Sequence, residues 1–131
     1  GPFGQNLRNG MYNLHMRYGE VCVLITKCIM FEKKLCNEFF KHAPMMRDIL
    51  KEGKPYWNGE DVFMSAVACH HYGVNNLAIR NCGNINPIPG RENRNRRAVS
   101  RWGGFRAYRS DVVRHCAKYF NIWQRWTGEQ T

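Results

Sequence analysis

An apolar pattern between residues 60 and 72 constrains the fold of this chain more than any other feature. Apolar residues recur there at intervals of three and four, as they do along one face of a helix. Gly73 follows as a stop signal, and Asn58 or Gly59 stands at the capping position. The pattern predicts a helix over 60–72 whose apolar face consists of Val62, Phe63, Ala66, Val67 and Cys69 or His70.

Two adjacent carboxylates, Glu60 and Asp61, open this helix. Acidic residues in a first helical turn meet the positive end of the helix dipole favourably, and many such residues do nothing more. A carboxylate pair at the start of a helix could also form part of a sugar-binding site. Both interpretations are open on these residues alone.

Weaker patterns predict three strands. Apolar residues alternate over 12–18, which is typical of an edge strand, and a nearly continuous apolar run predicts a buried strand at 21–26. A short strand is predicted at 77–79.

Further helices are predicted at 31–41, 45–52 and 110–123. Ser110 or Asp111 would cap the last of these. Its apolar face would consist of Val112, Cys116, Tyr119, Phe120 and Trp123.

The composition is that of one globular unit. With 131 residues, 44% of them hydrophobic and 13% aromatic, the chain can bury a single core of ordinary size. It contains no apolar run of membrane-spanning length and no N-terminal signal pattern. Strands and helices in this order favour an α/β layer arrangement within one domain over 1–131.

Cysteines and histidines lack metal-ligand spacing. The six cysteines form no Cys-x-x-Cys unit, and the adjacent His70 and His71 would point about 100° apart on a helix. No metal ligands are therefore predicted. Cys69 is expected to be a small core residue. Up to three disulfides are possible, for which Cys82 and Cys116 are the better candidates.

Positive charge is concentrated late in the chain. Residues 1–79 hold nine Lys/Arg and seven Asp/Glu, a net charge of +2, whereas 80–131 hold eleven and three, a net charge of +8. A loop rich in Asn, Gly and Pro is predicted there. It is either a solvated loop or a binding segment for a diphosphate or an acidic polysaccharide, and it carries Arg91, Arg94, Arg96, Arg97 and Arg101.

Several stretches share a resemblance to one family. Asn58-Gly-Glu-Asp61, followed by its apolar segment, is similar to an Asn-Cys-Glu/Asp-Asp helix start. Residues 21–44 and 47–50 are similar to the strand, helix and short run that precede that start, and 109–120 is similar to a late Arg-Ser-x-Cys helix. Over roughly residues 20–123, the chain thus resembles the C-terminal half of the exostosin-like glycosyltransferases (glycosyltransferase family 64).

The resemblance implies a partial GT-A-like (nucleotide-diphospho-sugar transferase) fold, a mixed sheet with flanking helices. Residues 1–131 would be the acceptor-side half of such a domain. The implied activity is transfer of a hexosyl or N-acetylhexosaminyl group from a nucleotide-sugar donor to a glycan or glycoprotein acceptor. An exostosin-like enzyme would retain the anomeric configuration, whereas a fringe-like enzyme would invert it.

The resemblance also implies residue roles. Asp61 would lie beside the anomeric carbon and stabilise an oxocarbenium-like state, or act as general base in an inverting enzyme. Glu60 would bind acceptor or sugar hydroxyls, and Arg109 would neutralise charge on the departing diphosphate. The expected substrate-binding residues are Trp57, which is also a core candidate, Asn58, Arg97 and Arg101.

The chain departs from the family pattern in two respects. Gly59 and Val112 replace two cysteines that look like disulfide partners in the family, so their joint absence is consistent. No Asp-x-Asp motif is present to hold Mn²⁺ on the diphosphate, and a whole GT-A domain is about twice this length. The resemblance therefore implies a missing N-terminal half or a second chain that binds Mn²⁺, and a Golgi or secretory-lumen location.

An alternative class is a polyanion-binding module for RNA or acidic glycan. It would use the arginine-rich loop, with Trp102, Phe105 and Tyr108 as stacking surfaces. The chain shows no RNP, KH or helix-turn-helix signature, so nucleic acid is the less favoured partner. A third possibility is a non-catalytic, glycosyltransferase-like subunit.

Overall fold

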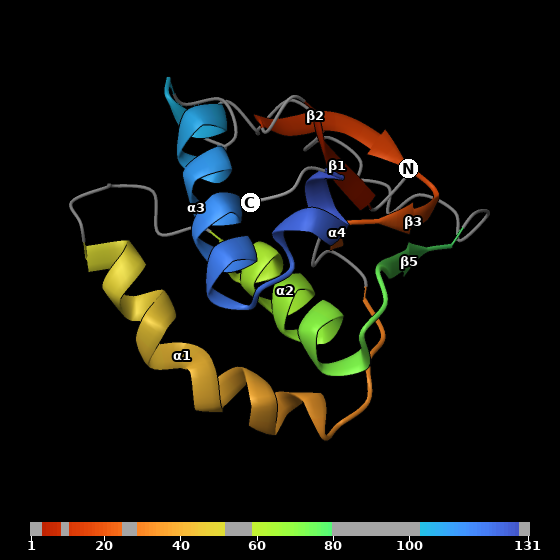
Figure 1. Ribbon diagram of the computed structural model, residues 1–131, viewed down its shortest axis with the longest axis vertical. Helices are drawn as coiled ribbons and strands as arrows, with labels where there is room; N and C mark the ends of the chain where they lie inside the picture. Colours follow the sequence, from red (N-terminus) through yellow and green to blue (C-terminus); the bar gives the residue numbers. More distant parts are fainter. Residues whose placement is uncertain (1–3, 9–10, 25–28, 52–58, 80–102, 129–131) are drawn as a thin grey trace, which may run out of the picture.

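A computed structural model of the chain describes residues 4–8, 11–24, 29–51, 59–79 and 103–128 (Figure 1). These residues form four helices and five short strands, which confirms the expected mixed α/β fold.

The strands form two small sheets. β1 (Gly4–Arg8) pairs with β2 (Met11–Arg17) and with β4 (Val23–Leu24), and β3 (Gly19–Val21) pairs with β5 (Asn76–Ala78). All of these pairs are antiparallel. The mixed sheet that the resemblance implies is thus not found in the described part of the chain.

The expected strand at 21–26 is divided at Cys22. β3 belongs to the two-stranded sheet and β4 to the three-stranded sheet, so the chain changes sheets at this buried residue. A continuous apolar run indicates burial, but it does not indicate which neighbour each half pairs with.

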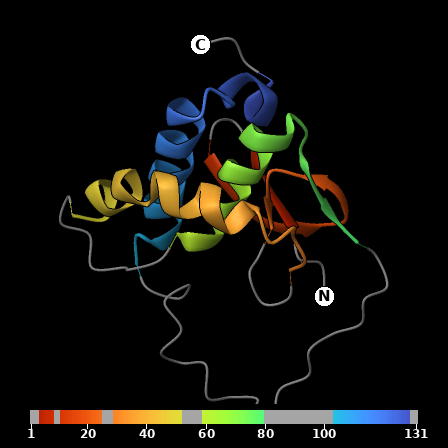
Figure 2. The same ribbon diagram turned by 90° about the horizontal axis from the view of Figure 1, so that it is seen from below.

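Helix α2 (Glu60–Tyr72) is central, and it contacts α1 (Leu35–Lys51), α3 (Phe105–Tyr119), β4 and β5 (Figures 1 and 2). Its bounds agree with the prediction. The helix ends at Gly73, which has a left-handed backbone (φ 70°) and donates its N–H to the Cys69 carbonyl at 2.9 Å. Cys69 is buried and His70 exposed, which settles the choice between them, and the rest of the predicted apolar face is buried.

The prediction of two helices at 31–41 and 45–52 is wrong, because α1 is one helix with Pro44 inside it. Proline lacks the N–H that would continue the helical ladder, so a break was expected there. Packing on both sides of the proline explains the continuity. Phe39 packs edge-on against Phe63 with ring centroids 4.8 Å apart, and Met46 is buried in the same core.

The last predicted helix is also bounded differently. α3 begins at Phe105 instead of at 110, and the Ser110 hydroxyl, expected to cap the helix, donates to the Arg106 carbonyl inside it at 2.9 Å. The chain turns at Asn121, which has a φ of 56°, before α4 (Trp123–Thr127). Tyr119 is exposed and Trp123 only partly buried, whereas Val112, Cys116 and Phe120 lie in the core as expected.

The core lies between the four helices and the strands, with Leu35 and Met46 contributed by α1. Polar contacts fix α2 against β4, since the Leu24 N–H donates to the Ser65 hydroxyl at 2.9 Å. The Asn76 side-chain amide donates to the carbonyls of Cys22 and Ser65. The thiol of the same Cys22 donates to the carbonyl of Trp126 in α4 at 3.5 Å.

Candidate functional site

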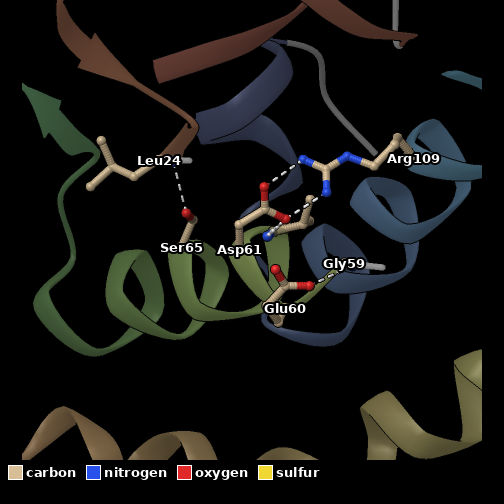
Figure 3. A network of polar contacts seen from close by, with 7 residues as sticks. Leu24, Gly59, Glu60, Asp61, Ser65 and Arg109 are labelled. Carbon is tan, nitrogen blue, oxygen red and sulfur yellow. Dashed lines mark hydrogen bonds and ion pairs between the residues drawn. The ribbon is translucent and has the colours of Figure 1, made fainter. Parts of the chain in front are cut away.

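Asp61 and Arg109 form a buried ion pair where α2 meets α3 (Figure 3). The two terminal guanidinium nitrogens donate separately to the two carboxylate oxygens, at 2.5 Å for Nη1–Oδ1 and 2.8 Å for Nη2–Oδ2. The side chains of Arg109 and Asp61 are only 4% and 9% exposed. This bidentate geometry suits the planar fork of arginine, and burial protects the pair from screening.

Two local features position Asp61. As the second residue of α2, it has its carboxylate oxygen Oδ1 2.8 Å from the N–H of Val62, which donates to it. Free N–H groups at a helix start stabilise a carboxylate there. The dipole interpretation of the acidic pair therefore holds for Asp61, and the ion pair with Arg109 adds to it.

A close approach of α3 positions Arg109. Gly59 precedes α2 with a φ of 148°, a backbone conformation that favours glycine. A Cβ atom at Gly59 would lie 2.9 Å from the Met46 Cε and 3.1 Å from the Val112 Cγ1. Val112 is one helical turn after Arg109, so the missing side chain at Gly59 lets this part of α3 reach the start of α2.

Glu60 differs from its neighbour in exposure and in hydrogen-bond partner. It is exposed, and one of its carboxylate oxygens accepts the Gly59 N–H at 3.1 Å. In Figure 3 a Glu60 carboxylate oxygen meets the Gly59 N–H, whereas the Asp61 carboxylate faces Arg109. The acidic pair is thus divided into one buried, paired carboxylate and one carboxylate at the surface.

Of the seven site residues predicted from the sequence, the structure describes three: Glu60, Asp61 and Arg109. It brings Asp61 and Arg109 into direct contact. The expected substrate-binding residues lie outside the described residues, as does most of the arginine-rich loop: Trp57, Asn58, Arg97 and Arg101. The chemical roles of all seven remain predictions.

The described residues do not fit a Mn²⁺ site. No group of three His, Cys, Asp or Glu side chains gathers within the described ranges. Both oxygens of Asp61 already accept from Arg109, and one Glu60 oxygen accepts the Gly59 N–H. His70 uses Nδ1 to donate to the carbonyl of Phe120 at 3.1 Å.

The described cysteines are free thiols: Cys22, Cys36, Cys69 and Cys116. Cys69 is buried, as predicted for a core residue, and desolvation raises the pKa of its thiol. Burial raises the pKa of Cys116 to about 12, so this thiol is not a nucleophile at neutral pH. The prediction of a disulfide stays untested, because Cys82 lies outside the described residues.

The polyanion-binding alternative predicted three stacking residues, and this prediction is wrong for two of them. Phe105 and Tyr108 are buried, with 8% and 4% exposure, so neither ring can stack on a base or sugar. Trp102 lies outside the described residues.

Sequence reasoning missed a second polar contact, between α1 and α3. His42 Nδ1 lies 3.1 Å from the hydroxyl of Tyr119, and His42 Nε2 lies 3.9 Å from a carboxylate oxygen of Glu38. The i, i+4 spacing of Glu38 and His42 places both on one helix face. Nothing in the sequence pointed to Tyr119, which is 77 residues from His42.

Among the helices that the structure describes, none is long and apolar enough to span a membrane. In comparisons with known proteins, no family model, no curated protein and no solved structure matches this chain.

Proposed function

We propose that this chain is part of a glycosyltransferase in which Asp61 and Arg109 act together on a nucleotide-sugar donor. One observation carries the proposal: two residues 48 positions apart, taken from two separate motifs, meet in one buried pair. The resemblance assigns Asp61 to the anomeric carbon and Arg109 to the departing diphosphate. These roles require the two groups to be close, because the anomeric carbon and the leaving oxygen are bonded to each other.

A second contact supports the resemblance independently of charge. Gly59 and Val112 occupy the positions at which the family has two cysteines. Disulfide-linked residues have Cβ atoms about 3.5–4.5 Å apart. A Cβ atom at Gly59 would be 3.1 Å from the Val112 Cγ1. The two positions are therefore neighbours in this fold, as the family's disulfide would require.

The pair suggests how donor binding would change the site. A diphosphate offers oxygens that suit the guanidinium fork as well as a carboxylate does. A donor that drew Arg109 toward its diphosphate would leave Asp61 facing the sugar. The Asp61 carboxylate would then stabilise positive charge at the anomeric carbon while Arg109 stabilised negative charge on the leaving group.

The remaining parts of the proposal follow from the same resemblance. Glu60, exposed beside the pair, is suited to accept hydrogen bonds from hydroxyls of the acceptor or the sugar. The nucleotide and its Mn²⁺ would be held by a missing N-terminal half or a second chain, since the described residues do not fit that ion. A partial GT-A-like domain of this kind would act in the Golgi or secretory lumen and would retain the donor's configuration.

The test is transfer and hydrolysis across a panel of nucleotide-sugar donors, with and without Mn²⁺. The chain and any longer protein that contains it are compared with their Asp61→Asn and Arg109→Lys variants. Asp61→Asn is nearly isosteric, and Asp111→Asn is a matched control because Asp111 pairs with Arg114 at the surface of α3, at 3.3 Å. Thermal melts establish that each variant is folded.

We expect turnover to fall at least about 100-fold in Asp61→Asn and Arg109→Lys, as for removal of one transition-state contact. Asp111→Asn should keep it. Full turnover by a folded Asp61→Asn variant would contradict the proposal. A protein that never turns over a donor, yet binds RNA or heparin in a salt-dependent way, would favour the polyanion-binding class.

A further inference from the structure

A second polar cluster lies at the contact between α1 and α3, apart from the Asp61–Arg109 pair. It consists of Glu38, His42 and Tyr119, with His70 of α2 nearby. The Tyr119 side chain is half exposed, with 51% exposure, whereas the side chains of His42 and Glu38 are 18% and 30% exposed. The solvent-exposed hydroxyl of Tyr119 thus lies next to the imidazole of His42, and the imidazole lies next to the carboxylate of Glu38.

The groups on the two sides of the ring favour one tautomer of neutral His42. Glu38 lies on the Nε2 side, and a carboxylate accepts but does not donate, so it favours a proton on Nε2. Nδ1 then carries a lone pair, and the hydroxyl of Tyr119 donates to it at 3.1 Å. This is the tautomer that a general base for the phenol requires.

Burial is the main reason that His42 favours its neutral form. Burial lowers the pKa of His42, and Lys41 of α1 and His70 of α2 act in the same direction. Glu38 acts in the opposite direction, and Tyr119 is the titratable group that faces the ring from α3. His42 is therefore available as a base at neutral pH.

We propose that Glu38, His42 and Tyr119 form a base-assisted nucleophile in which the Tyr119 hydroxyl accepts an acyl group from an activated donor. The phenolic oxygen attacks the acyl carbon and forms an ester bond, while the bond from that carbon to its leaving group breaks. The phenolic proton passes to His42 Nδ1 and from there to the leaving group. His42 touches the reacting hydroxyl, and Glu38 is a positioning residue that acts through His42.

Tyr72 provides an internal reference. It is 37% exposed, so a reagent reaches it nearly as well as it reaches Tyr119. Its hydroxyl is hydrogen-bonded to Glu32 instead of to a histidine, and the pKa of Tyr72 is raised, first by desolvation and then by that carboxylate. Tyr72 thus reports the reactivity of an accessible phenol without an imidazole base.

The experiment is acetylation of the whole chain by N-acetylimidazole, with the rate at each tyrosine followed by peptide mass spectrometry. The step releases imidazole and leaves O-acetyl tyrosine. Hydroxylamine then removes the acetyl group and restores the tyrosine. We expect Tyr119 to react at least about tenfold faster than Tyr72 at neutral pH, in line with general-base assistance. His42→Gln should lower the Tyr119 rate at least about tenfold, because the general base is lost, while the Tyr72 rate stays unchanged.

The pH profile of the unmodified protein supplies a test that needs no variant. The Tyr119 rate should level off once the imidazole is neutral, whereas the Tyr72 rate should keep rising toward the pKa of a phenol. Glu38→Gln should move the midpoint of the Tyr119 profile to lower pH, because the carboxylate that raises the pKa of His42 is lost. Equal rates at Tyr119 and Tyr72, or parallel pH profiles, would overturn the proposal.

Discussion

Helix α3 makes two polar contacts of opposite character with its neighbours. Toward α2 it contributes Arg109, which is buried, charged and joined to Asp61 by two hydrogen bonds. Toward α1 it contributes Tyr119, which is half exposed and joined to the neutral His42 by one contact. We infer that the first contact contributes more to the stability of the fold, because removing one partner from a buried ion pair is costly.

The largest expected effect is that of Asp61→Ala. The Arg109 guanidinium would stay buried without its carboxylate, which costs about 3–5 kcal/mol of unfolding free energy. Urea unfolding at pH 7 measures the loss. The double variant Asp61→Ala/Arg109→Met should recover part of it, since no buried charge remains. A loss under about 1 kcal/mol in the single variant would show that water reaches the pair.

Gly59→Ala should have the next largest effect, because it tests the close approach that forms the buried contact. The new methyl would clash with Met46 and Val112, and alanine would have to adopt a φ of 148°. Together these effects should lower the unfolding free energy by about 3 kcal/mol. Gly73→Ala is the matched control, with a φ of 70° and no atom within 4 Å of the new methyl. It should cost about 1–2 kcal/mol, from the left-handed backbone alone.

A Val112→Ala substitution sharpens the Gly59 prediction. In a double-mutant cycle, the two substitutions should couple favourably, because Val112→Ala removes both Val112 atoms that the Gly59→Ala methyl would meet, Cγ1 at 3.1 Å and Cγ2 at 3.7 Å. Strictly additive unfolding free energies would argue against the contact.

The contact between α1 and α3 should make stability depend on pH. The pKa of His42 is lowered from 6.5 in the folded chain, so the unfolded chain binds more protons near that pH. The stability that neutral His42 contributes is complete above about pH 6.5 and is lost as the pH falls through its folded pKa. Urea midpoints between pH 7.5 and pH 5 should fall less in His42→Gln than in the unmodified chain. Identical slopes would contradict this prediction.

The smallest effect is expected for Asp111→Asn. Asp111 and Arg114 are an exposed pair on α3, with side chains 52% and 39% exposed, and solvent screens their attraction. The unfolding free energy should change by less than about 0.5 kcal/mol in the same urea assay. A change near that of Asp61→Ala would remove the contrast between buried and exposed pairs on this helix.

The sequence predicted local features better than contacts between elements. The bounds of α2 followed from apolar spacing and from Gly73, which are properties of a few adjacent residues. Pro44 and Ser110 misled because their usual preferences, to break and to cap helices, were outweighed by core packing and by a hydrogen bond within the helix.

For the candidate site too, the sequence pointed to individual residues but not to the contacts between them. Asp61 and Arg109 were singled out separately through the resemblance, and only the structure brings them together. The contact between His42 and Tyr119 had no signal, because an isolated histidine and a tyrosine in an apolar pattern each have an ordinary explanation. Direct contact between such residues depends on how α1 crosses α3, which local periodicity does not specify.

The contact between Cys22 and Trp126 has a consequence for how the chain is made. These residues are 104 positions apart, yet the thiol of one meets the carbonyl of the other. During synthesis the strands leave the ribosome long before α4 does, and the core that they share cannot close until residue 126 has emerged. Until then, the core cluster that contains Val23 lacks Trp126, and apolar surface left uncovered in this way favours aggregation of a nascent chain.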